Sequence, residues 1–156
     1  MFGACMEFDQ FYDEIESFTK LPGVIDALTV EAFERVQKSK QANQQKNIVY
    51  IWRTQNKFPR FNGESDILYI GQTKQSFAQR YSNHSKWIGT EANRLKYQHA
   101  IKYYGGITIS VCDFRKFGET LKDAEGLLLW WYFKHHYEYP PINYTKTSIR
   151  RNEYER

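Results

Sequence analysis

The sequence predicts a small α+β domain that follows an N-terminal helical segment. Three short segments rich in β-branched and aromatic residues lie in the central and C-terminal parts of the chain, and helical patterns lie between and after them. The expected order after residue 45 is β-β-α-α-β-α. We therefore expect a helical extension over residues 1–45 and a main domain over residues 46–156. A chain of 156 residues is long enough for a compact core without disulfides.

Two helical patterns occupy the N-terminal extension. Apolar residues recur at three- and four-residue steps over Glu7–Phe18, which is typical of an amphipathic helix. Pro22 and Gly23 end this pattern. Thr29 is a suitable cap for a second helix, whose apolar pattern fades in the polar stretch that follows.

The three strands of the main domain differ in pattern. Asn47–Arg53 and Asp66–Gly71 are apolar without clean alternation, which suits strands covered on both faces. The loop between them contains Pro59 and an Asn-Gly pair, so the two strands are expected to pair antiparallel. The third strand lies within residues 105–114 and alternates apolar with polar residues, which is typical of a half-buried strand.

Helices are expected over about Ser76–Lys86, Thr90–Tyr104 and Thr120–His136. The last of these carries Glu125 on its apolar side, with leucines three and four residues away. An ionised carboxylate that faces the core is costly unless it is paired or bound to a metal. Glu125 is therefore a candidate metal ligand, and a salt bridge to an arginine at the edge of the core is the alternative.

Four further residues could take part in phosphate chemistry. Tyr50 and Tyr69 lie in the two strands that should be adjacent, and Arg80 and His84 lie one turn apart on the following helix. Arginine offers two parallel hydrogen bonds to a phosphate, and histidine can donate a hydrogen bond or exchange a proton. The alternatives are ordinary sheet packing for the tyrosines and a solvated helix edge for the Arg/His pair.

Charge is distributed unevenly along the chain, whose net charge is +4. Residues 1–34 contain eight acidic residues and one lysine, whereas the remainder holds 21 of the 22 Lys and Arg and 10 of the 18 Asp and Glu. A basic body indicates a polyanionic partner such as nucleic acid. An ordinary solvated basic surface is the alternative.

No membrane partner or export is expected. The sequence has no run of about 18 apolar residues, and its start lacks the features of a signal peptide. The protein should be soluble and cytoplasmic. Cys5 and Cys112 show no metal-ligand spacing, and the adjacent His135 and His136 suit a helix end better than a metal site because neighbouring helical residues point apart.

An ordered set of short motifs resembles the GIY-YIG nuclease superfamily. The set comprises Val49-Tyr50, Tyr69-Ile70-Gly71, Arg80 with His84, Glu125, and Asn143 in the stretch PPINYT. The first motif departs from the family because Ile48 replaces its glycine, and Gln72 replaces a basic residue that some relatives carry. The resemblance covers about residues 47–144 and implies a three-stranded antiparallel sheet flanked by helices.

The same resemblance implies a role for each site residue. Glu125 would hold one divalent ion, usually Mg²⁺ with Mn²⁺ as a substitute. Tyr50 would be the general base on water and Tyr69 would orient that water. Arg80 would bind the scissile phosphate, His84 would assist the nucleophile, and Asn143 would support the site by hydrogen bonding.

DNA is accordingly the expected partner. The residues expected to contact nucleic acid are Lys57, Arg60, Gly71, Lys74, Lys86, Arg94 and Lys102. The long interval between the two tyrosines resembles that of restriction endonucleases in the family. A restriction, defence or mobile-element enzyme is expected, with a structure-specific repair nuclease and a catalytically silent nucleic-acid-binding module as alternatives. One active site cuts one strand, so double-strand cleavage would favour a homodimer.

Overall fold

A four-stranded antiparallel sheet organises the computed structural model, which describes residues 10–83 and 89–143. Strand β3 (Ile48–Pro59) is central and pairs with β4 (Glu64–Thr73) on one side and with β5 (Ile107–Asp113) on the other. The expected α+β class and the order of elements after residue 45 are confirmed. The sheet has four strands where three were expected.

The additional strand comes from the N-terminal segment. Strand β2 (Thr19–Lys20) pairs antiparallel with β5 through Thr19 opposite Val111 and Lys20 opposite Ser110. The chain then continues along the same edge, where the Leu21 amide donates to the Ile109 carbonyl at 2.8 Å. A two-residue strand carries no periodic signal, so it forms because β5 offers an open edge and not because of its own sequence.

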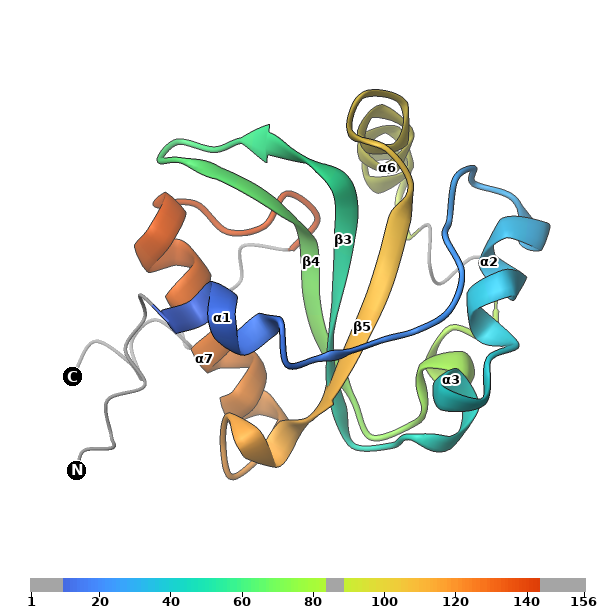
Figure 1. Cartoon of the computed structure of the whole chain (residues 1–156), viewed down its shortest axis with the longest axis horizontal. Coiled ribbons are helices and arrows are strands. Elements are labelled where there is room, and N and C mark those ends of the chain that lie inside the picture. Colours follow the sequence, from blue (N-terminus) through green and yellow to red (C-terminus); the bar gives the residue numbers. More distant parts are fainter. Residues whose placement is uncertain (1–9, 84–88, 144–156) are drawn as a thin grey trace.

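Both faces of the sheet are covered. Ile48, Tyr50 and Trp52 of β3 point into one apolar cluster, whereas Val49 and Ile51 point into another, and all five are buried. The first face is covered by α2 (Val30–Gln37), α3 (Lys40–Gln44), α4 (Phe77–Arg80) and α6 (Glu91–Tyr104). The second face is covered by α1 (Phe11–Ile15) and α7 (Leu121–His136), and Figure 1 shows the sheet between the two groups.

Capping residues fix where several helices begin. The Thr29 side chain accepts from the Ala32 amide at 3.1 Å, and Thr120 does the same for Asp123 at 3.0 Å. Ser76 and Gln79 form a reciprocal capping box at the start of α4. Helix α1 ends at Ile15, before the expected Phe18, because the chain turns there to join the sheet as β2.

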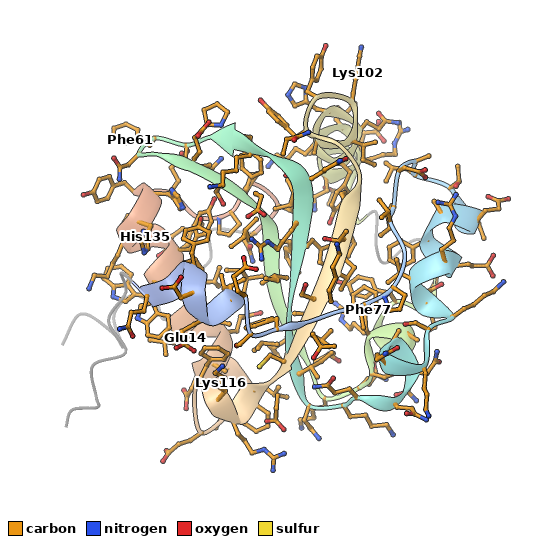
Figure 2. The ribbon with its side chains drawn as sticks, viewed as in Figure 1. Glu14, Phe61, Phe77, Lys102, Lys116 and His135 are labelled. Carbon is orange, nitrogen blue, oxygen red and sulfur yellow. The ribbon has the colours of Figure 1, made fainter. Side chains whose placement is uncertain are left out.

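The end of the β3–β4 hairpin is bound to the C-terminal end of α7. Asn62 donates from its backbone to the His136 carbonyl at 3.2 Å and from its side chain to the His135 carbonyl at 2.7 Å. Arg60 donates to the Tyr139 carbonyl at 2.7 Å. Phe61, at the hairpin end in Figure 2, remains 82% exposed. Among residues 10–83 and 89–143, no helix has the length and apolar character needed to cross a membrane.

Candidate functional site

Tyr50 and Gly71 form a cross-strand pair in which the tyrosine ring lies close to the glycine backbone. A Cβ atom at Gly71 would lie 2.6 Å from Cζ of Tyr50 and 2.7 Å from Cε2 of Tyr69. Both distances are shorter than van der Waals contact allows. The glycine is therefore required so that two tyrosine rings can approach the backbone of β4.

Tyr69 lies on the same sheet face as Tyr50, because it is two residues from Gly71 in β4 and pairs with Trp52. Trp52 pairs with Tyr69 and the next residue, Arg53, pairs with Ile67, which leaves Leu68 as an extra residue in β4. Leu68 and Tyr69 consequently both contact the cluster on the Tyr50 face. The ring centroids of Tyr50 and Tyr69 are 6.1 Å apart. The structure thus brings together Tyr50 and Tyr69, two of the site residues expected from the sequence.

The short helix α4 adds Arg80 and Tyr81 to this group. The hydroxyl groups of Tyr50 and Tyr81 lie 2.8 Å apart, within hydrogen-bonding distance. The guanidinium carbon of Arg80 lies 5.2 Å from the centre of the Tyr81 ring. Tyr81 is not among the residues expected at the site, because no local signal in the sequence distinguishes a core tyrosine from one whose hydroxyl faces another strand. Together with Tyr97 of α6, these residues form what we call the tyrosine site: Tyr50, Tyr69, Tyr81, Tyr97 and Arg80.

Burial determines the protonation of these phenols. It raises the pKa of Tyr50 well above its usual value, with the neighbouring phenols of Tyr81 and Tyr69 acting in the same direction. Burial likewise raises the pKa of Tyr81 and of Tyr97. The positive charge of Arg80 opposes the shift at Tyr50 and Tyr81. At neutral pH the phenols are therefore neutral and can donate hydrogen bonds.

Asn143 is joined to the middle residue of the Tyr69-Ile70-Gly71 motif. Its side-chain oxygen accepts from the Ile70 amide at 3.0 Å, and its side-chain nitrogen donates to the Ile70 carbonyl at 2.8 Å. The neighbouring Ile142 amide donates to the Leu68 carbonyl at 3.0 Å. The loop after α7 thus fixes the outer edge of β4 beside the tyrosine site.

Glu125 lies on α7, which covers the sheet face opposite the tyrosines. The residue is 8% exposed, and the adjacent Ala124, Leu128 and Leu129 belong to the apolar cluster of that face. Within the described part of the chain, no three His, Cys, Asp or Glu side chains gather as a metal site. Mg²⁺ is commonly held by one or two carboxylates together with water and substrate phosphates. A carboxylate suits such an ion, but the structure places Glu125 on the other sheet face and does not bring it together with Tyr50, Tyr69 and Arg80.

The residues expected to contact nucleic acid differ in exposure and in ion pairing. Lys57, Lys74 and Lys102 are exposed, and Lys102 projects from α6 in Figure 2. The Arg94 side chain pairs with Glu91 at 2.5 Å. The Arg60 side chain is only 12% exposed and lies 3.5 Å from Glu138. His84 and Lys86 lie outside the described residues.

A second polar cluster joins α1, the hairpin and α7 on the opposite side of the molecule. His136 Nδ1 lies 2.7 Å from the Asn62 carbonyl, and its Nε2 lies 2.5 Å from the Tyr12 hydroxyl. The Tyr12 hydroxyl also lies 3.0 Å from that of the fully buried Ser65. Because a carbonyl oxygen only accepts, Nδ1 carries the proton and the neutral ring accepts from Tyr12. His136 therefore connects the C-terminal end of α7 to the β3–β4 hairpin and to α1.

Fold and site together define an α+β domain with an arginine beside a group of tyrosines on one face of the sheet. No known protein family, curated protein or solved structure matches the chain. The function proposed below therefore rests on the residues and their geometry.

Proposed function

We propose that the chain is a Mg²⁺-dependent DNA endonuclease of the GIY-YIG type. The observation that carries the proposal is the packing of Tyr50 and Tyr69 around Gly71, with Arg80 over the neighbouring Tyr81 and Asn143 bonded to the same strand. These residues come from β3, β4, α4 and the loop after α7. Except for Tyr81, they are the residues that the ordered motifs single out.

Each side chain of the site has a chemical task in this proposal. Arg80 binds the scissile phosphate and stabilises its additional charge in the transition state. Tyr69 and Tyr50 donate hydrogen bonds that orient the attacking water. Asn143 keeps β4 in place while these groups act. The exposed lysines of the basic body, Lys57, Lys74 and Lys102, contact neighbouring phosphates.

A metal ion completes the proposed chemistry. Glu125 would hold Mg²⁺, which would neutralise charge on a phosphate and help the 3′ oxygen to leave. Because Glu125 lies on the sheet face opposite the tyrosine site, this role requires the DNA to extend around the end of the sheet. A base role for Tyr50 requires that its raised pKa fall when substrate is bound. Arg80 acts in that direction because its positive charge favours the phenolate.

Plasmid cleavage tests this proposal. Purified protein is incubated with supercoiled DNA in Mg²⁺ or EDTA, together with the variants Glu125→Gln and Arg80→Ala. We expect cleavage in Mg²⁺ only, and a loss of about 10²–10³-fold in rate for Arg80→Ala. Arg115→Ala is the matched control because Arg115 is an exposed arginine paired with Asp113 away from the site. A fully active Glu125→Gln variant would remove the metal role of Glu125.

A catalytically silent nucleic-acid-binding module is the second candidate. The observation that favours it is the buried, neutral Tyr50, which is a poor base. This candidate predicts DNA binding without Mg²⁺-dependent cleavage. If cleavage occurs, end mapping separates a sequence-specific restriction or defence enzyme of the cytoplasm from a structure-specific repair nuclease. Discrete ends indicate the former, and ends at branched or damaged positions indicate the latter.

A further inference from the structure

A groove of about 530 Å³ lies between the β3–β4 hairpin, α6 and the loop after α7. Phe58 and Tyr104 contribute aromatic walls to it, with ring centroids 5.6 Å apart. Leu95 of α6 also lines the groove and is 57% exposed, so a large apolar side chain faces this space. The groove is therefore wide enough and apolar enough to receive a flat ring.

The groove adjoins the tyrosine site on the same face of the sheet. The bulge in β4 directs Leu68 into the cluster that contains Tyr50, and Leu68 lines the groove. Leu68 of β4 and Lys96 of α6 line the groove, and the residue that follows each of them, Tyr69 and Tyr97, belongs to the tyrosine site. Adjacent Cα atoms are about 3.8 Å apart and stacked nucleotides follow at about 3.4 Å. The groove and the tyrosine site therefore meet along β4 and α6, where one DNA strand can contact both.

The charges around the groove favour a nucleic acid. Lys96 and His99 are exposed on its α6 side, and Lys96 donates to the Pro141 carbonyl at 2.8 Å, which holds its ammonium group at the rim. Glu138, which also lines the groove, lies 3.5 Å from Arg60 and its charge is thereby compensated. An apolar slot with a cationic rim matches a base, whose faces are apolar, attached to an anionic backbone.

We propose that this groove binds an unstacked nucleobase of the DNA strand whose phosphate lies at the tyrosine site. The proposal rests on the proposed function and specifies its substrate. DNA in which a base can leave the helix is preferred over a perfect duplex, because only such a base can enter the slot. Phe58, Leu95 and Tyr104 supply the apolar contact, and Lys96 and His99 hold the adjoining phosphates.

Fluorescence anisotropy in EDTA tests the groove separately from cleavage. The probes are a labelled duplex with one unpaired adenine and the same duplex with an abasic residue in that position. For the natural protein we expect about tenfold tighter binding to the adenine probe, since stacking of one base commonly contributes this much. Leu95→Glu should bring the ratio of the two Kd values close to one. Because Leu95 is largely exposed, this variant should fold normally.

Val30→Glu is the matched control, since Val30 is a 42% exposed apolar residue at the start of α2. It should keep the adenine preference. Equal affinities of the natural protein for the two probes, an unchanged ratio in Leu95→Glu, or no binding to either probe would overturn the proposal. Base preference without Mg²⁺-dependent cleavage would remove the nuclease and keep the groove. Mg²⁺-dependent cleavage with equal affinities for the two probes would keep the nuclease and remove the groove.

Discussion

At the scale of single residues, the hydroxyl pair of Tyr50 and Tyr81 connects the central strand to α4. The two oxygens are 2.8 Å apart, and both residues are almost fully buried. A buried hydroxyl that loses its partner is costly because water cannot replace the lost bond. The pair should therefore contribute to stability and also fix the phenol that the proposed reaction uses.

A double-mutant cycle measures this pair. We expect Tyr50→Phe and Tyr81→Phe each to lower the free energy of unfolding by about 1–3 kcal/mol. The double variant should lose less than the sum of the two, because neither phenol is then left unpaired. Urea denaturation of the natural protein, the two single variants and the double variant gives the coupling free energy between the two hydroxyls. Strictly additive losses would show that the two hydroxyls do not interact.

At the scale of elements, the junction of α1 with α7 depends on His136. Its ring is buried and accepts a hydrogen bond from Tyr12 of α1. Burial lowers the pKa of His136 below its usual 6.5. The hydrogen bond to the Asn62 carbonyl and the charge of Glu138 oppose this shift, whereas the nearby His135 and Arg60 act in the same direction as burial. The junction is therefore built for a neutral ring.

We expect stability to fall as the pH drops below about 6.5. The unfolded chain takes up a proton near its ordinary pKa, while the folded protein resists protonation until a lower pH, so acid favours unfolding in this window. Urea denaturation between pH 5 and pH 8 measures how steeply the free energy of unfolding changes with pH. This slope should become flatter in His136→Gln. The exposed His99 gives the control variant His99→Gln, which should keep the natural slope. An identical slope in all three proteins would contradict this role.

The elements predicted from the sequence were those with long, regular patterns. Helix α7 follows its expected range closely because capping and burial act on many consecutive residues. Strand β3 begins where expected but continues past Arg53 to Pro59, and the helix expected over about Ser76–Lys86 already ends at Arg80. The two-residue strand β2 and the short helix α3 were not expected, since their positions depend on contacts with distant parts of the chain.

The same distinction applies to the site. The motifs predicted Tyr50, Tyr69, Arg80, His84, Glu125 and Asn143. The structure brings Tyr50, Tyr69 and Arg80 together and bonds Asn143 to the adjoining strand edge. Glu125 lies on the opposite face of the sheet, and His84 lies outside the described residues. The bulge that turns Leu68 onto the face of Tyr50 and Tyr69, and the hydroxyl contact of Tyr81, could not be predicted, because each depends on how distant segments align.

At the scale of the whole molecule, the N-terminal segment forms part of both apolar clusters. Its buried apolar residues are Phe11, Ile15, Phe18, Leu21, Ile25, Ala32, Phe33, Val36 and Ala42. The ring of Phe33 lies 6.0 Å from that of Trp52 and 6.0 Å from that of Tyr81, so α2 directly supports the tyrosine site. The acidic segment is thus joined to the basic body through the core.

Removal of residues 1–45 should therefore prevent stable folding. Each large apolar side chain contributes about 1.5–3 kcal/mol on burial, and a whole domain is stable by only about 5–15 kcal/mol. We expect residues 46–156 alone to lack a cooperative thermal transition and a near-UV circular dichroism signal. Cooperative unfolding of that fragment, with a midpoint near that of the full chain, would show that the extension is dispensable.

Asn143 has a consequence for the sheet as a whole. An outer strand presents free amide and carbonyl groups to which another chain can add as a further strand. At Ile70 the Asn143 side chain satisfies both groups, as the peptide unit of a neighbouring strand would. Ile142 does the same for the Leu68 carbonyl. The loop after α7 thereby closes this part of the border of β4 to strand addition, which protects the protein against edge-to-edge aggregation.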